Sequence, residues 1–151
     1  MQPSPNQNIA EVSPASNKGN QLFPVFIKLN ELRTLLVGAG NVGLEKLNAI
    51  VNNSEEAKVT VVAQEINAAV FEIAASKPNV KIKQKAFTAD DLDDVDIVFA
   101  ATNDNTFNAE LRSLAHQKGL LINVADKPEL CDFRQPRPHD HRAPRSPRQW
   151  S

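Results

Sequence analysis

The segment with the clearest chemical signal is GAGNVG, which holds three of the five glycines of the chain, Gly38, Gly40 and Gly43. It directly follows the apolar run RTLLV and opens a helical pattern. In a G-x-G-x-x-G turn, the first glycine allows a tight bend, the second lets the backbone approach a pyrophosphate, and the third lets the helix pack closely on the strand. Free amides at the positive end of the helix dipole then face the anion. The spacing predicts a dinucleotide site; the alternative is a glycine-rich turn without a ligand.

An acidic residue follows at the distance where dinucleotide-binding folds hold the adenosine ribose. Such folds usually carry Asp or Glu at the end of the second strand, where the carboxylate binds the ribose hydroxyls. The second strand pattern here ends in Gln64 and Glu65. Glu65 could bind the ribose, or it could equally be a first-turn acid of the following helix. Because no arginine lies nearby to hold a 2′-phosphate, the sequence favours NAD over NADP as the cofactor.

Two later strand patterns also end in polar residues. The fourth leads into Thr102 and Asn103, and the fifth ends at Asp126. Ligands of open α/β sheets bind at the carboxyl ends of the strands, so we expect these residues near the nicotinamide half of the cofactor. Asp126 could act there as a general base or orient a proton donor. Alternatively, Thr102 and Asn103 only cap the next helix, and Asp126 only starts the turn before Lys127 and Pro128.

The sequence offers little for metal chemistry, and we expect no metal site. His116 lies near the end of a predicted helix, where a cation suits the helix dipole, so we interpret it as a surface residue. His139 and His141 lie among prolines and arginines, which is a poor setting for ligands. Five aspartates between residues 90 and 96 fit a solvated acidic loop better than a metal cluster. Since Cys131 is the only cysteine, neither a disulfide within the chain nor a cysteine-based zinc cluster can form.

These residues need a parallel sheet to bring them together. From residue 22 to residue 133, β-branched strand patterns alternate with helical patterns, as in βαβ units. We expect an extended segment at 23–29 and strands at 33–39, 58–63, 80–87, 96–102 and 120–126. We expect helices at 41–52, 66–77 and 105–118, the second ended by Pro78 and the third closed by Gly119. The pattern predicts a Rossmann-type, doubly wound α/β fold with strand order 3-2-1-4-5.

Composition separates this domain from its two ends. The chain of 151 residues is 41% apolar and 23% charged, as expected for one globular domain. Residues 1–20 are polar and proline-bearing, and residues 134–151 hold five arginines, four prolines and few apolar side chains, so we expect both to be disordered. With no secretory signal and no run of 18 apolar residues, we expect a cytoplasmic protein without a membrane span. The arginine tail could contact nucleic acid, but only Trp150 is present to stack, and we expect no nucleic-acid partner.

Four segments in this order make the pattern more specific: FPVFIKLNELRTLLVGAGNVGLEK, VTVVAQEI, IVFAATNDNTFN and INVADKPELCDF. Together they resemble the precorrin-2 dehydrogenase family, the N-terminal dehydrogenase module of siroheme synthase. The resemblance extends from about Leu22 to Phe133. It rests on the residues after the fourth and fifth strand patterns as well as on the glycines.

The resemblance implies NAD-dependent oxidation of precorrin-2 to sirohydrochlorin in siroheme biosynthesis, with iron chelation in some members. It implies that Asp126 is the catalytic residue, assisting proton removal as hydride leaves for NAD. The cofactor-binding positions that it implies, framed by Gly38, Gly40 and Gly43, are Asn41, Val42, Gln64, Glu65, Thr102 and Asn103.

After Phe133 the sequence departs from the family. Family members are homodimers and continue into a dimerisation region and a small helical domain, whereas this chain continues into the arginine- and proline-rich tail. The abrupt change from lysine to arginine suggests a chain truncated after residue 133, with an out-of-frame tail. The alternative function is an NAD-binding regulatory module without catalytic activity. In such modules an acidic residue usually follows the second strand directly, whereas here Gln64 stands first.

Overall fold

The computed structural model describes residues 21–135, and residues 27–134 form one compact unit that contains all the regular elements given below. The expected disordered arm at 1–20 and nearly all of the expected tail at 134–151 lie outside the described residues.

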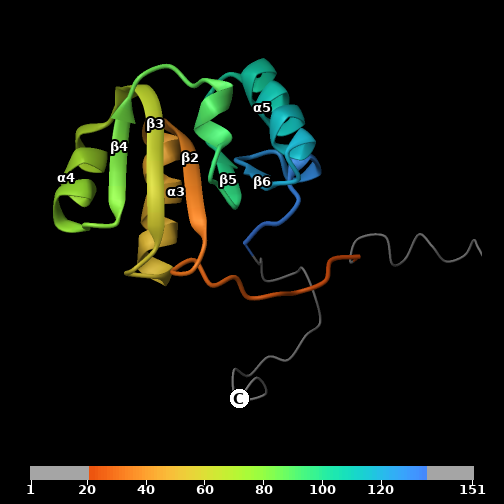
Figure 1. The fold of residues 1–151 in the computed structure, drawn as a ribbon, viewed down its shortest axis with the longest axis horizontal. Coiled ribbons are helices and arrows are strands. Elements are labelled where there is room, and N and C mark those ends of the chain that lie inside the picture. Colours follow the sequence, from red (N-terminus) through yellow and green to blue (C-terminus); the bar gives the residue numbers. More distant parts are fainter. Residues whose placement is uncertain (1–20, 136–151) are drawn as a thin grey trace, which may run out of the picture. The chain divides into compact units, whose positions relative to one another are not determined.

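A five-stranded parallel sheet forms the centre of this unit (Figure 1). Its strands are β2 (Arg33–Ala39), β3 (Lys58–Ile66), β4 (Val80–Gln84), β5 (Ile97–Ala100) and β6 (Leu121–Val124). They lie in the order β4-β3-β2-β5-β6, and every neighbouring pair is parallel. Numbered along the chain, this is the predicted order 3-2-1-4-5, so the doubly wound fold is confirmed.

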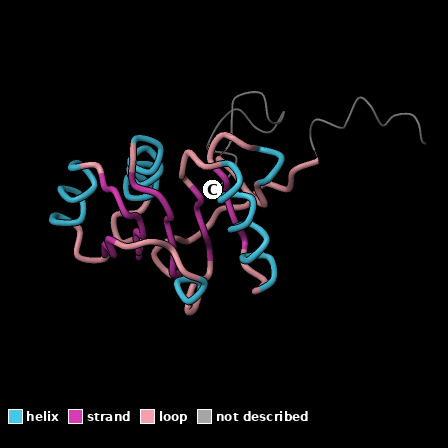
Figure 2. Tube along the Cα trace, turned by 90° about the horizontal axis from the view of Figure 1, so that it is seen from above, coloured by secondary structure: helices cyan, strands magenta, loops and turns pink. Residues whose placement is uncertain are grey.

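Helices cover both faces of the sheet (Figure 2). On one face lie α3 (Asn41–Asn53) and α4 (Ala68–Ser76), which connect the strands of one half of the sheet. On the other face lie α5 (Asn105–Gln117) and the short 3-10 helix η2 (Ala89–Leu92). The direction of winding therefore reverses at β2, and this reversal leaves a crevice at the carboxyl ends of β2 and β5, where ligands of such folds bind.

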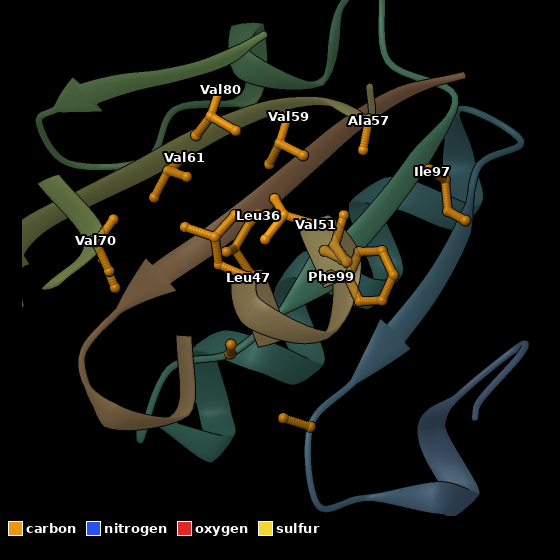
Figure 3. Close-up of a cluster of buried hydrophobic side chains, with 14 residues drawn as sticks. Leu36, Leu47, Val51, Ala57, Val59, Val61, Val70, Val80, Ile97 and Phe99 are labelled. Atoms are coloured by element: carbon orange, nitrogen blue, oxygen red, sulfur yellow. The ribbon is translucent and has the colours of Figure 1, made fainter. Parts of the chain in front are cut away.

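Each face has its own apolar core. Under α3, the side chains of Leu36 and Leu47 are fully buried and lie next to Val51 and Phe99 (Figure 3). Under α5, Leu111 is fully buried in a second cluster. Burial of each such side chain stabilises the fold by about 1.5–3 kcal/mol. The apolar runs of the central strands are thus explained by helices on both sides.

The expected strand boundaries were least accurate at the carboxyl edge. β3 continues to Ile66, three residues beyond the expected end, and the helix expected from 66 begins only at Ala68. In the pairing of β2 with β3, Val37 lies opposite Val62 but Ala39 lies opposite Ile66. Only Gly38 therefore faces the three residues 63–65, which form a bulge in β3 before the pairing resumes at Ala39 and Ile66. β4 ends at Gln84 rather than at 87, and β5 and β6 are also shorter than expected.

The end of α5 follows the expected pattern. Gly119 has φ +73°, its amide donates to His116 O, and the amide of Leu120 donates to Ala115 O. These two bonds form a Schellman motif, which requires a left-handed residue and so favours glycine. The closure predicted from the sequence is confirmed.

The extended segment expected at 23–29 forms no strand. Its backbone makes a local bond instead, from the amide of Leu29 to Ile27 O. The apolar side chains of Ile27 and Leu29 pack on the core beneath α3, which explains the apolar pattern without a place in the sheet.

Candidate functional site

A pocket of about 450 Å³ opens at the carboxyl edge of the sheet, where β2, β3 and β5 end. Its volume is typical of small-molecule sites. The bulge of β3 opposite Gly38 lies at this edge, and its three residues, 63–65, line the pocket. Eight of the residues predicted to bind the cofactor line this pocket: Gly38, Gly40, Asn41, Val42, Gln64, Glu65, Thr102 and Asn103.

The three glycines have three different surroundings. Gly38 has φ +111°, and a Cβ there would overlap the carbonyl oxygen of Ala101 and lie 3.1 Å from the amide nitrogen of Thr102. Gly43 does not line the pocket but packs against the carbonyl group of Gly38, where a Cβ would also overlap. A Cβ on Gly40, in contrast, would meet no atom within 4 Å. Gly38 and Gly43 thus allow the tight turn, and Gly40 leaves space where a pyrophosphate could approach.

The amino terminus of α3 is suited to an anion. No side chain caps it and no acidic residue lies in its first turn. The other two described α-helices are capped, α4 by Asn67, whose Oδ1 accepts from Ala69 N, and α5 by Asp104, whose Oδ1 accepts from Phe107 N. Uncapped amides and the helix dipole favour a phosphate at this position. The space at Gly40 and this helix terminus together fit a dinucleotide.

The Asn41 side chain, at the start of α3, is held by a hydrogen bond from Asn67, the residue that caps α4. Its Oδ1 accepts a hydrogen bond from Asn67 Nδ2 at 3.2 Å, and the amide of Asn67 donates to Ala39 O at 2.8 Å. These bonds join the glycine turn to the start of α4. Asn67 was not predicted to contribute to the site, although its place as an N-cap residue can be read from the sequence.

Gln64 and Glu65 lie in β3, and both are exposed at the pocket. Glu65 is separated from α4 by the cap residue Asn67, so it is not a first-turn acid of that helix. Its carboxylate therefore has the strand-end position that ribose-binding carboxylates occupy. The carbonyl of Gln64 accepts from Gln84 Nε2 at 3.2 Å, which joins the ends of β3 and β4.

Thr102 is fixed by a hydrogen-bonded pair that the sequence did not reveal. Its hydroxyl donates to Asn108 Oδ1 at 2.6 Å, and Asn108 Nδ2 donates back to the Thr102 carbonyl at 3.1 Å. Asn108 is only 2% exposed. The helix is capped by Asp104 rather than by Thr102 or Asn103. The spacing of Asn108 with Leu111 and Ala115 on the buried face of α5 is the signal that could have identified it.

One side of the pocket, formed by the residues after β4, was also not predicted. Lys85, Ala86 and Phe87 follow β4 and line it, together with Phe107 of α5. The rings of Phe87 and Phe107 pack edge to face with centroids 5.7 Å apart. The sequence predicts that residues 85–87 continue the strand, but β4 ends at Gln84 and these residues line the pocket instead.

Asp126 lies in the turn after β6, outside the residues that line the pocket. It is exposed and has φ +63°, a left-handed conformation that is unfavourable for residues other than glycine, although Asp and Asn tolerate it better than most. Among residues 21–135, no hydrogen bond or ion pair of its carboxylate is found, so that group does not stabilise its own turn. Left-handed residues of this kind are enriched at functional sites.

The turn that carries Asp126 is held by Cys131. The amide of Val124 donates to Cys131 Sγ at 3.1 Å, and the thiol lies 3.1 Å from Val124 O and 3.4 Å from Lys127 O. Burial raises the pKa of the Cys131 thiol. The thiol thus gives the backbone of Val124, at the end of the edge strand β6, the hydrogen-bond partner that a neighbouring strand would otherwise supply.

Of the residues considered for metal binding, His139 and His141 lie outside the described residues, and His116 is paired with an acidic residue. His116 Nε2 lies 2.7 Å from Asp132 Oδ2. In the part of the chain that the structure describes, no group of three or more such residues could hold a metal ion, and none of its helices is long and apolar enough to cross a membrane.

The acidic loop pairs with three basic residues: Asp91 with Lys85 just after β4, Asp93 with Lys118 at the end of α5, and Asp96 with Arg33 of β2. Asp96 and Arg33 make two side-chain hydrogen bonds of 3.0 Å, and this contact lowers the pKa of Asp96 to about 2. The aspartates therefore anchor the loop to the sheet and α5.

Comparison with known proteins gives a consistent family. The family model described as "Putative NAD(P)-binding" matches residues 25–137. A siroheme synthase from Methylococcus capsulatus is 36% identical over 111 residues, which are 74% of this chain and 23% of that protein. A siroheme synthase from Thioalkalivibrio sulfidiphilus is 36% identical over 116 residues, 76% of this chain and 23% of that protein. The chain thus spans about a quarter of the length of these relatives.

A solved structure agrees with these relatives. The protein described as SirC, precorrin-2 dehydrogenase, has a TM-score of 0.57 and 26% identity to this chain, covering 69% of this chain and 49% of that one. The family model covers most of this chain and includes the whole of the pocket described above. The protein belongs to this NAD(P)-binding family, and the predicted resemblance to the precorrin-2 dehydrogenase module of siroheme synthases is confirmed.

Proposed function

We propose that this chain is the cofactor-binding part of an NAD-dependent dehydrogenase that oxidises precorrin-2 to sirohydrochlorin in siroheme biosynthesis. The observation that carries the proposal is that the open position at Gly40, the uncapped start of α3 and the exposed Glu65 share one pocket. The named activities of the relatives support the choice of substrate.

Each part of the cofactor has a matching part of the pocket. The pyrophosphate would lie against Gly40 and the first turn of α3. The adenosine ribose would lie at Glu65, whose carboxylate accepts hydrogen bonds from hydroxyls and repels a 2′-phosphate, which favours NAD. The nicotinamide would extend toward Thr102 and Asn103, where the Thr102–Asn108 pair keeps the loop in place. When bound, NAD supplies the hydride acceptor.

We assign proton removal from the substrate to Asp126. Its carboxylate is exposed, unpaired among the described residues and held on a turn that Cys131 fixes. An unpaired carboxylate can accept a proton from a substrate group while hydride leaves for the cofactor. Asn41, Val42 and Gln64 have supporting parts in this proposal, because they shape the cofactor pocket without carrying charge.

The test is to incubate the chain, fused after residue 133 to the dimerisation region and helical domain with which family members continue, with precorrin-2 and NAD⁺ and to follow NADH and sirohydrochlorin by absorbance. NAD⁺ affinity is measured separately by calorimetry. The proposal expects both products from the wild type. Asp126→Asn is expected to bind NAD⁺ nearly as well but form no product, whereas Gly40→Val loses binding and turnover together.

The same experiment separates the second candidate function. That candidate is a regulatory module that binds NAD without catalysis, and it is favoured by the place of Asp126 outside the pocket lining. Binding of NAD⁺ without oxidation of precorrin-2 would support this module and contradict the dehydrogenase. Absence of any nicotinamide dinucleotide binding would contradict both.

A further inference from the structure

We propose that Asp91 sets the cofactor preference of the pocket by holding the ammonium group of Lys85 away from the ligand, so that a ribose hydroxyl is accepted and a 2′-phosphate is not. This inference rests on the proposed cofactor site and adds the residues that determine its specificity. Asp91 does not line the pocket, so it acts through Lys85 as a positioning residue.

Lys85 is the basic residue that could attract a phosphate to this side of the pocket. Among the residues that line the pocket it alone carries positive charge, whereas Glu65 and Asp104 are acidic. Its backbone amide donates to Ala63 O at 2.9 Å, which places Lys85 beside the end of β3, the strand that carries Glu65. A free lysine there would be well suited to bind a 2′-phosphate.

Lys85 is not free. Its Nζ donates to Asp91 Oδ2 at 2.6 Å and to Ala86 O at 3.1 Å. The ammonium group thus uses two of its three donors within the protein. A phosphate would have to break the charged pair and lie near the Glu65 carboxylate as well.

Asp91 is itself firmly held. Its side chain is 4% exposed, and the same Oδ2 accepts from the amide of Thr88 at 2.8 Å in a capping box at the start of η2. Burial would raise the pKa of Asp91, but the hydrogen bonds from Lys85 and Thr88 outweigh it and leave the pKa below its ordinary value. The carboxylate therefore stays charged at neutral pH and retains Lys85.

The test is titration of the whole chain with NADH and with NADPH, followed by ligand fluorescence, to give the ratio of the two dissociation constants. Asp91→Asn keeps an oxygen that can accept the Thr88 amide but loses the charge. The variant is expected to lower the Kd for NADPH, so that the ratio of the Kd for NADPH to the Kd for NADH falls about tenfold. A change of this size corresponds to one new hydrogen bond between the freed ammonium group and the 2′-phosphate. A general loss of protein stability would weaken the binding of both ligands and would not change the ratio of their dissociation constants.

Asp93→Asn is the matched control. Asp93 belongs to the same loop and pairs with Lys118 at 3.2 Å, but Lys118, unlike Lys85, does not line the pocket. Its ratio is expected to equal that of the wild type. The double variant Asp91→Asn, Lys85→Met is expected to restore the wild-type ratio, because the released ammonium group is gone.

Lys85→Met in the wild-type background gives a second test that does not depend on Asp91→Asn folding. Because Lys85 is already occupied, the ratio is expected to change by less than about twofold. A large rise in the ratio would mean that Lys85 binds the phosphate in the wild type, and it would overturn the inference. An unchanged ratio in a folded Asp91→Asn variant would overturn it too while leaving the cofactor site intact. Binding of neither ligand by the wild type would overturn the proposed function and the inference together.

Discussion

Gly43 packs directly against the carbonyl group of Gly38, so that a side chain on Gly43 would overlap the turn that Gly38 makes. Between them, Gly40 faces open space at the pocket. The same six-residue motif therefore contains a glycine needed for packing and a glycine needed only when a ligand is present.

This difference predicts opposite results for substitutions at two glycines that are three residues apart in the sequence. Gly43→Ala is expected to lower the free energy of unfolding by about 3 kcal/mol, at the upper end of overpacking costs, because the opposing atoms belong to the backbone. Gly40→Val is expected to unfold near the wild-type midpoint in urea but to bind NAD⁺ at least about tenfold more weakly. Equal stability losses in both variants would contradict this division.

The left-handed backbone of Asp126 predicts a gain in stability when the side chain is removed. Asp126→Gly is expected to raise the free energy of unfolding by up to about 1 kcal/mol, because glycine adopts φ +63° without strain, and to abolish oxidation of precorrin-2. Asp94→Gly is the control, since Asp94 has φ 60° but precedes β5, at the amino-terminal edge of the sheet, where its exposed carboxylate makes only a 3.7 Å contact with Arg33. It is expected to be stabilised similarly with unchanged cofactor binding. Destabilisation of Asp126→Gly would show that its side chain has a structural role instead.

The fold could be predicted almost entirely from hydrophobic patterns, because the buried strands of a doubly wound sheet are apolar on both faces. The site was predicted where glycine spacing reports backbone geometry directly, as at Gly38. The site was not predicted where the exact end of a strand decides which residues line the pocket. Residues 85–87 continue the alternating pattern of β4, and only the divergence of the chain after Gln84 brings Lys85 and Phe87 to the pocket. A contact such as Thr102–Asn108 depends on the geometry between a strand end and a helix, which local pattern does not reveal.

The Arg33–Asp96 contact predicts a pH dependence of stability at acid pH. Because the folded protein holds the pKa of Asp96 at about 2, below the ordinary 3.8, the contribution is present above pH 4 and is lost as the pH falls toward 2. Wild type should therefore unfold at higher urea concentration than Asp96→Asn at pH 6, and the difference should shrink toward zero near pH 2. Arg33→Gln is expected to remove most of this pH dependence, and a difference that persists at pH 2 would contradict the assignment.

The buried pair between Thr102 and Asn108 predicts coupled effects on stability. Asn108→Ala removes both hydrogen bonds and leaves a cavity, so we expect a loss of about 2–4 kcal/mol in the free energy of unfolding. Thr102→Val is expected to cost about 1–3 kcal/mol, since the oxygen of Asn108 loses its donor. The two losses should not add in the double variant. Additive losses would show that the side chains act independently.

The position of Cys131 predicts a slowly reacting thiol. Burial raises the pKa of the Cys131 thiol, and its sulfur is engaged with Val124, so little reactive thiolate is present at pH 8. An aromatic disulfide reagent is expected to label the folded chain at least about tenfold more slowly than the urea-unfolded chain. Equal labelling rates in the folded and unfolded states would contradict the hydrogen bonds by which Cys131 holds the turn that carries Asp126.

The most direct measurement is a titration of the ¹⁵N-labelled chain with NAD⁺, followed by amide chemical shifts. We expect saturable shifts at Gly38, Gly40, Asn41 and Thr102, with smaller changes at Glu65 and none in the Asp93–Asp94 loop. Gly40→Val is expected to abolish them. Absence of shifts at these amides, or shifts confined to another surface, would contradict the cofactor site at the carboxyl edge of the sheet.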